Sequence, residues 1–248
     1  MDDLSYNTER RFYGDDESQF VDIASPLGEP RGVIVSYHGG YWRAAYGLDL
    51  HDRIVEHCVG LGWAVVNAEY RRIEPGTAGV WNAMANDVLC AAAVAETIPV
   101  DGPLVALGHS AGGHLALWVA AQDKINVDAV IALAPVADLV GADRRQLSDH
   151  VTLDLLGFSA TDEPLAYEAA SPMHLLPLGI PQLVMHGPSD DRVPFAMAEE
   201  YVNAARVAGD DVTFATGEEI DHFTVIDPAH PRWREVDAFL DSLCLDCR

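Results

Sequence analysis

Short apolar runs alternate with segments of helical periodicity along most of the chain. A short continuous apolar run bounded by turn residues is typical of a strand buried on both faces, and such strands belong to parallel sheets covered by helices. Their regular alternation with helices predicts an α/β fold with a doubly wound, mostly parallel sheet. The predicted strands are 32–37, 63–68, 104–108, 127–134, 182–186 and 212–216, and the predicted helices cover 50–61, 81–98, 111–122, 193–207 and 233–243.

Two segments depart from this alternation. Residues 20–24, which precede Pro26, are expected to form an antiparallel entry strand. Residues 138–177 are polar, contain Pro164 and Pro172 and show only short helical pieces between two predicted core strands. We interpret this stretch as an insertion within a single domain of residues 1–248. Ligands bind over the strand ends of open α/β sheets, so the insertion is expected to form a small cap or lid; an ordinary long connection is the alternative.

Composition narrows the possible partners. The 248 residues are 49% hydrophobic, enough for one substantial core, and the net charge is −24, from 15 Lys+Arg against 39 Asp+Glu. This charge repels polyanions, so we expect a small-molecule substrate and neither nucleic acid nor a membrane as partner. The first six residues lack the basic and apolar regions of a signal peptide, which favours a cytoplasmic location. The sequence leaves the oligomeric state open, with a homodimer as one option.

A serine motif stands between a predicted strand and a predicted helix. Residues 108–112 read Gly-His-Ser-Ala-Gly, and in this context a G-x-S-x-G motif forms a sharp turn that raises the serine hydroxyl above the sheet. The flanking glycines remove Cβ atoms that would clash in such a turn. We therefore predict that Ser110 is a nucleophile, placed at the positive end of a helix, and that the N–H of Ala111 contributes to an oxyanion hole.

The sequence GHSAGGH after an apolar strand resembles the nucleophile elbow of the α/β-hydrolase family, and the resemblance extends over residues 32–243. It implies a triad in the order serine, acid, histidine. The segment HGPSDDRVP resembles the H-G-x-x-D-x-x-V-P segment of the family, which places the acid at Asp190, with Asp191 as the alternative. The base is expected at His222, in the sequence D-H-F after the last predicted strand, with His230 as the alternative.

The predicted strand 32–37 runs into the sequence His-Gly-Gly-Tyr-Trp. Two glycines let the backbone turn sharply, and the loop at this position supplies the second part of the oxyanion hole in this fold. We expect donors from Gly39, Gly40 and Tyr41 in addition to Ala111, and a structural role for His38.

The longer motif H-G-G-x-W resembles the kynurenine formamidases (arylformamidases) of the α/β-hydrolase fold. The resemblance implies cleavage of an aryl formamide through an acyl-enzyme. Tyr41, Trp42 and Trp81 are expected to give an aromatic substrate pocket, with core packing as the alternative for Trp42.

Two other functions stay open from the sequence. The first is a carboxylesterase that acts on short-chain esters, since the acid segment is shared with esterases. The second is a non-catalytic ligand-binding protein of the same fold, although such proteins usually lack part of the triad. We expect no metal and no cofactor, because the chain has no H-E-x-x-H, G-x-G-x-x-G or P-loop motif and the pair Cys244 and Cys247 lacks a second ligand pair nearby.

Overall fold

A computed structural model describes residues 6–245 and contains one eight-stranded sheet in the order β1-β2-β4-β3-β5-β6-β7-β8. The strands from β4 to β8 in this order run parallel, and β1 and β2 pair antiparallel at one edge. The predicted fold class is therefore confirmed. The strands are β1 Tyr6–Phe12, β2 Phe20–Pro26, β3 Val33–Tyr37, β4 Ala64–Ala68, β5 Leu104–His109, β6 Ala129–Leu133, β7 Gln182–Met185 and β8 Val212–Ala215.

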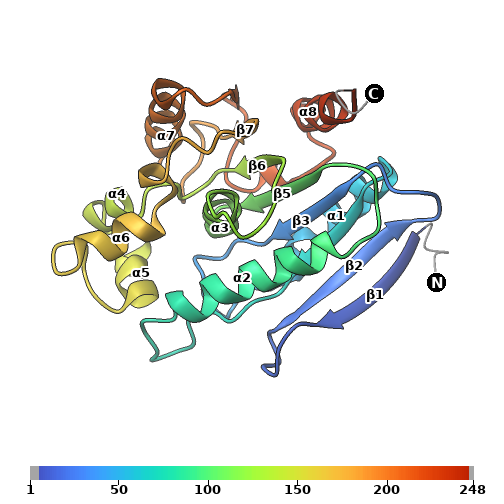
Figure 1. Cartoon of the computed structure of the whole chain (residues 1–248). Helices are drawn as coiled ribbons and strands as arrows, with labels where there is room; N and C mark the ends of the chain where they lie inside the picture. The colour runs from blue at the N-terminus through green and yellow to red at the C-terminus, as the bar shows by residue number, and fades with distance from the viewer. Residues whose placement is uncertain (1–5, 246–248) are drawn as a thin grey trace.

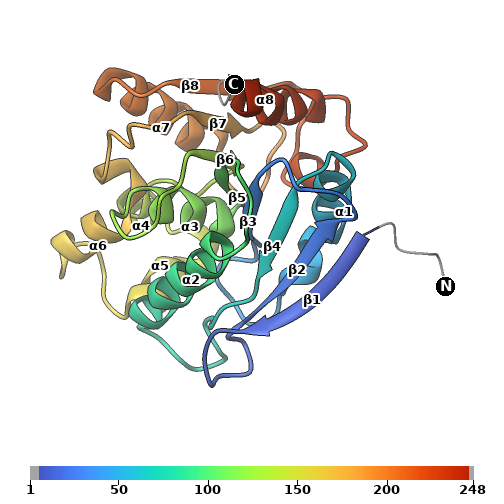
Figure 2. The same cartoon turned by 45° about the vertical axis from the view of Figure 1, so that its right-hand side comes forward.

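Helices cover both faces of the sheet (Figure 1 and Figure 2). On β3, Val35 packs into one apolar core and its neighbour Ile34 into the other, which explains why the central strands read as continuous apolar runs. One face is covered by α1 (Asp52–Gly60) and α8 (Trp233–Leu245), and the other by α2 (Trp81–Glu96), α3 (Ala111–Ala120) and α7 (Phe195–Ala208).

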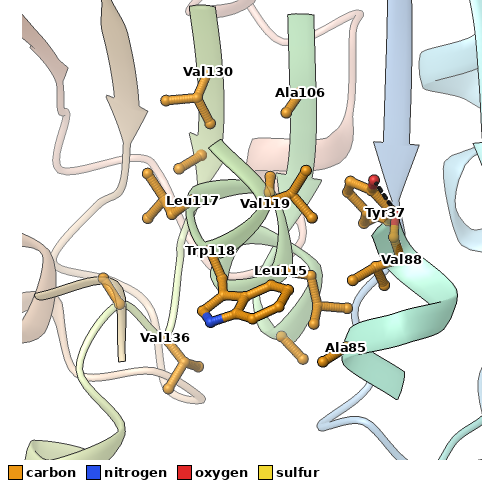
Figure 3. Packing of buried hydrophobic residues seen from close by; sticks show 14 of the residues in the cluster. Tyr37, Ala85, Val88, Ala106, Leu115, Leu117, Trp118, Val119, Val130 and Val136 are labelled. Carbon is orange, nitrogen blue, oxygen red and sulfur yellow. Dashed lines mark hydrogen bonds between the residues drawn. The ribbon is translucent and has the colours of Figure 1, made fainter. Parts of the chain in front are cut away.

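Helix α3 is buried on every side except at its last residue. Its side chains Leu115 and Val119 pack near Tyr37 of β3 and Val88 of α2 (Figure 3). The buried Tyr37 hydroxyl donates a hydrogen bond to the carbonyl oxygen of Val88 at 2.8 Å. A helix that is apolar all round is expected only in such a core, and the packing holds the N-terminus of α3 fixed against the sheet.

The segment between β6 and β7 folds into short helices at one end of the molecule (Figure 1, yellow). Its apolar side chains, among them Val151 and Tyr167, join the core on the α3 face of the sheet. Its role as a cap stays a prediction. The helices are α4 Leu139–Arg144, α5 Leu147–Leu156, α6 Pro164–Ala170 and the 3-10 turn Pro172–His174.

Candidate active site

Ser110 occupies the turn between β5 and α3, as the motif predicts. Its backbone has φ 56° and ψ −120°, a conformation that L-residues adopt only when the surroundings impose it. The glycines of the motif are required for space, because a Cβ at Gly112 would lie 1.9 Å from the carbonyl oxygen of Tyr37 and one at Gly108 would lie 2.0 Å from the carbonyl oxygen of Gly112. The turn is further fixed by the hydrogen bond from the Ser110 N–H to the Leu133 carbonyl at 2.8 Å.

The three residues expected to form a triad lie in one hydrogen-bonded chain. The Ser110 hydroxyl donates to Nε2 of His222 at 3.1 Å, and Nδ1–H of His222 donates to Oδ2 of Asp190 at 2.7 Å. All three side chains are nearly inaccessible to solvent, which strengthens the polar contacts between them. The residues come from the β5–α3 turn and from the loops that follow β7 and β8, so the sheet gathers them at the carboxyl ends of its strands.

The alternatives for the acid and the base lie outside this chain of contacts. The Asp191 side chain is 76% exposed and pairs with Arg192 at 3.2 Å. The Nδ1 atom of His230 accepts a hydrogen bond from the backbone N–H of Arg232 at 3.3 Å. Neither side chain hydrogen bonds to Ser110 or His222 within the described part of the chain.

Asp190 has hydrogen-bond donors on both of its oxygens. Oδ1 accepts the backbone N–H groups of Arg192 and Val193, each at 2.8 Å. Oδ2 accepts Nε2–H of His186 at 2.9 Å in addition to the contact with His222. Burial raises the pKa of this carboxyl, but the hydrogen bonds from the two histidines outweigh it, and the net pKa lies below the usual range. Asp190 therefore stays ionised at neutral pH. In the sequence, the only mark of His186 is its place as the first residue of the H-G-x-x-D segment, which by itself does not reveal a contact with Asp190.

The loop that follows β3 passes close to the elbow. A Cβ at Gly39 would lie 3.1 Å from the Cβ of Ser110. The next residues have positive φ: 110° at Gly40, 54° at Tyr41 and 58° at Trp42. Within residues 6–245, no hydrogen bond uses the backbone N–H of Gly40, Tyr41 or Ala111, so these groups are free to act as oxyanion donors.

The cavity beside Ser110 is small, with a volume of about 140 Å³. Tyr41 lies in its wall, and its hydroxyl donates to the carbonyl oxygen of Arg192, another lining residue, at 2.9 Å. The role of Tyr41 in binding a substrate stays a prediction. The loops contribute further apolar walls that the sequence analysis did not identify, because residues in irregular loops follow no periodic pattern. The lining consists of Gly40, Tyr41, Tyr46, Leu50, His109, Ser110, Arg192, His222, Phe223 and Ile226.

Two residues expected in the substrate pocket lie elsewhere. Trp42 is fully buried and packs edge-on against His114, with ring centroids 5.3 Å apart. Trp81 packs against Trp118 at 5.0 Å and does not line the cavity. The expectation for Trp42 and Trp81 is therefore wrong, and core packing is the correct reading of Trp42. The reason is packing: Trp42 belongs to the core on the α3 face of the sheet, and Trp81, at the start of α2, packs against Trp118 of α3.

A family comparison gives the chain its place among known proteins. Residues 85–243 match the sequence model of the prolyl oligopeptidase family. The chain belongs to this family. The match includes Ser110, Asp190 and His222 and covers more than half of the chain, and it identifies this protein as a serine hydrolase of the α/β-hydrolase fold. No curated protein matches the sequence.

Solved structures agree with the fold of this prolyl oligopeptidase family member. A truncated carbohydrate esterase from gut microbiota superposes with a TM-score of 0.81 at 19% identity and 99% coverage of both chains. Esterase B from Lactobacillus rhamnosis gives 0.80 at 18% identity, with 98% of this chain and 88% of that chain covered. Thermogutta terrifontis esterase 2 gives 0.74 at 23% identity, with 95% and 94% covered. At these identities the likeness concerns the fold alone. The matches do not confirm the resemblance to arylformamidases.

Buried polar groups around the site of this family member hold its loops in place. His109, the residue before the elbow serine, donates from Nε2 to the carbonyl oxygen of His222 at 2.8 Å, and burial lowers its pKa well below the usual range. His109 therefore stays neutral and ties the loop of the candidate base to β5.

A second buried group supports the loop after β3. His38 lies within 2.7 Å of the Gly39 carbonyl oxygen through Nδ1 and within 3.0 Å of Glu69 Oε1 through Nε2. Glu69 also pairs with Arg72 at 2.8 Å and accepts the backbone N–H of Leu48 at 3.2 Å. The structural role expected for His38 thus has a partner network that the sequence analysis did not foresee.

The described residues, 6–245, also bear on metal ligation and on membrane insertion. No group of three or more His, Cys, Asp or Glu side chains in this range is arranged to hold a metal ion. None of the helices between these residues is long and apolar enough to cross a bilayer. Cys247, one half of the terminal cysteine pair, lies outside the described residues.

Proposed function

We propose that this chain is a carboxylesterase that hydrolyses esters of short acyl groups through an acyl-enzyme on Ser110. The observation that carries the proposal is the buried chain of hydrogen bonds from Ser110 through His222 to Asp190, which opens into a cavity of about 140 Å³. Pockets for drug-sized ligands measure about 300–1,000 Å³, so this cavity suits a much smaller acyl or alcohol group.

The geometry supports the following reaction. The Ser110 hydroxyl transfers its proton to Nε2 of His222 as Oγ attacks the ester carbonyl carbon. The carboxylate of Asp190 stabilises the imidazolium that forms. The developing oxyanion accepts hydrogen bonds from the N–H of Ala111 and from Gly40 or Tyr41. His222 then returns the proton to the alcohol oxygen as that bond breaks. A water molecule attacks the acyl-enzyme by the same route and releases the carboxylic acid.

The structural relatives support this reaction class. The three proteins compared above carry esterase names, and one of them is described as phosphoramylated by tabun, a covalent inhibitor. The cavity wall supports a small neutral substrate, because Tyr41, Tyr46, Leu50, Phe223 and Ile226 give it a largely apolar surface.

An arylformamidase is the second candidate, and the aromatic wall of the cavity favours it. Tyr41, Tyr46 and Phe223 offer faces on which an aromatic leaving group could stack. A formyl group is the smallest acyl group and needs little of the available volume. In this case His222 would return the proton to the amine nitrogen, and the products would be formate and an aryl amine.

Substrate profiling tests both candidates. We expect kcat/KM to be highest for p-nitrophenyl acetate, to fall at least about tenfold for the octanoate because a longer chain exceeds the cavity, and to exceed the value for N-formylkynurenine. A preference for N-formylkynurenine by several orders of magnitude would replace the carboxylesterase by the formamidase.

The nucleophile is tested separately by covalent labelling. A fluorophosphonate probe should label the wild type and the exposed, remote control Ser242→Ala, and should not label Ser110→Ala, because the probe needs an activated serine. Equal labelling of Ser110→Ala and the control would remove Ser110 from the reaction and with it the proposed mechanism.

A further inference from the structure

One carboxylate oxygen of Asp190 accepts hydrogen bonds from two imidazole rings. Nδ1 of His222 lies 2.7 Å from Oδ2, and Nε2 of His186 lies 2.9 Å from that atom. We propose that His186 is a positioning residue, which orients Asp190 and, by sharing Oδ2, limits how strongly the carboxylate increases the basicity of His222. This inference rests on the proposed function, because it assigns a role relative to the reaction of Ser110.

His186 is held in a single orientation. It follows directly after β7, is fully buried, and its backbone N–H donates to the carbonyl oxygen of Ala215 at 3.1 Å. The ring packs edge-on against Phe195 with centroids 5.6 Å apart. Nε2 faces two acceptors, Oδ2 of Asp190 and the Val193 carbonyl oxygen at 3.2 Å, so the proton of the neutral ring belongs on Nε2.

The other nitrogen indicates that His186 does more than fill space. Nδ1 is buried and has no hydrogen-bond partner within residues 6–245. An unsatisfied buried polar atom destabilises the folded state, and an apolar side chain of similar size would avoid this cost. An apolar side chain would lack the N–H donor on Nε2 of His186. The acceptor of that N–H is the carboxylate of Asp190, which also contacts the candidate base His222.

Sharing one oxygen has a predictable electrostatic effect. A hydrogen bond from His186 draws on the negative charge of Oδ2 and leaves less of it to stabilise a proton on His222. Without this donor, the imidazolium of His222 is stabilised more strongly, and the base becomes protonated at a higher pH. The carboxylate also loses one of its four hydrogen bonds and is less firmly oriented, which lowers kcat.

Other groups around the Asp190–His222 pair would stay unchanged in a variant of position 186. They come from the end of β5, the loop after β3, the 3-10 turn Leu48–His51 before α1, and the loops after β7 and β8. These groups are His109, Tyr41, His51, Arg192 and Asp221.

The test is the pH profile of kcat/KM on p-nitrophenyl acetate, whose acid limb reports the base in the free enzyme. His186→Phe keeps a ring and removes the donor, whereas His186→Gln keeps an N–H. We expect His186→Phe to raise the midpoint of the acid limb by about half to one pH unit and to lower kcat about 10- to 100-fold. His186→Gln should restore most of both values.

His114 provides a matched control. It is also fully buried, and its Nε2 donates to the carbonyl oxygen of Ala170 at 2.8 Å. Its Nδ1 has no hydrogen-bond partner in the described part of the chain, and no hydrogen bond there joins it to Asp190. His114→Phe should leave the midpoint at the wild-type value. The proposal would be overturned if His186→Phe kept both the wild-type midpoint and the wild-type kcat. It would also be overturned if His186→Phe lost kcat without any shift of the midpoint and His186→Gln did not restore that kcat.

A measurement on the wild type keeps the proposal falsifiable if His186→Phe does not fold. The ¹⁵N chemical shifts of His186 should show a protonated Nε2 and an unprotonated Nδ1, and a proton on Nδ1 alone would overturn the inference. The labelling of Ser110 described above is independent of position 186. Its failure would refute the proposed function, whereas unshifted profiles with intact labelling would refute the role of His186 alone.

Discussion

Replacing Glu69 by glutamine removes a buried charge beneath the loop that approaches Ser110. Glu69 is 6% exposed, and its carboxylate contacts His38 at 3.0 Å, Arg72 at 2.8 Å and the backbone N–H of Leu48 at 3.2 Å. Burial raises the pKa of this carboxyl, but the contacts with His38 and Arg72 outweigh it, and the net pKa is lowered. Glu69 is therefore ionised at neutral pH and joins both ends of the loop from His38 to Leu48.

The size of the stability loss follows from the Arg72 charge, which the glutamine would leave without its carboxylate partner. The Arg72 side chain is only 12% exposed, and removing one partner of a buried ion pair costs about 3–5 kcal/mol. Glutamine keeps one oxygen acceptor, so we expect a loss near the lower end, about 3 kcal/mol of the free energy of unfolding. A loosened loop would also misplace the N–H groups of Gly40 and Tyr41, which are the candidate oxyanion donors, and losing one such donor costs about 10²–10³ in kcat.

The assay combines urea unfolding with kcat/KM on p-nitrophenyl acetate. Glu200→Gln is the control, because Glu200 is 47% exposed and pairs with Arg145 at the surface, where such a change stays within about 0.5 kcal/mol. Because the pKa of Glu69 is lower in the folded state, its contribution is present above the unfolded pKa of about 4.3 and is lost as pH falls through the folded value. The difference between wild type and Glu69→Gln should therefore shrink below about pH 4. A Glu69→Gln protein as stable and active as the control would refute the reasoning.

Three further changes have expected outcomes. Gly112→Ala places a Cβ 1.9 Å from the carbonyl oxygen of Tyr37 and should cost about 3 kcal/mol in urea unfolding, whereas Gly60→Ala, with no atom within 4 Å of its Cβ, should be neutral or slightly stabilising. Tyr41→Ala enlarges the cavity and should raise the octanoate-to-acetate ratio of kcat/KM at least about tenfold, while Tyr41→Phe should leave that ratio near the wild-type value. Burial lowers the pKa of His114 from 6.5 to about 4, so wild-type stability should fall by up to about 3 kcal/mol as pH drops from about 6.5 towards 4. His114→Gln should show a shallower fall over that interval in urea unfolding at each pH; an identical pH dependence would contradict the assignment.

The fold could be predicted where burial on two faces leaves a mark in the sequence. Strands such as β3 and β4 contain almost only apolar residues, because each successive side chain enters one of two cores. Strand β1 leaves no such mark. Its sequence YNTERRF is polar and largely exposed, and it forms a strand because β2 offers an edge and because Arg10 pairs with Asp22 across the two strands at 2.7 Å. Pairing of this kind depends on tertiary context and not on local pattern.

The pocket could be predicted only in part, for a reason that Tyr41 and Trp42 make clear. The two residues are adjacent and both aromatic, and nothing in their identity says which one faces the substrate. In the structure Tyr41 lines the cavity and Trp42 lies in the core, within a loop where the two residues have positive φ angles of 54° and 58°. Such angles depend on how the loop is anchored, here by the hydrogen bond from Ile73 to the Trp42 carbonyl at 2.8 Å.

The histidines show the same distinction between motif and contact. The chain has ten, and the motifs draw attention to several of them, but a base is defined by what its two nitrogens face. His222 has a hydroxyl on one side and a carboxylate on the other, which is the arrangement expected of a base that takes a proton from Ser110. His186 faces the same carboxylate with one nitrogen, and among residues 6–245 the other nitrogen has no hydrogen-bond partner. His186 can therefore orient Asp190 but has no hydroxyl in this range to accept a proton from. His109 donates to a backbone carbonyl and can only hold the loop. Residue type and order were enough to nominate the base, whereas the supporting histidines become distinguishable only from the atoms they contact.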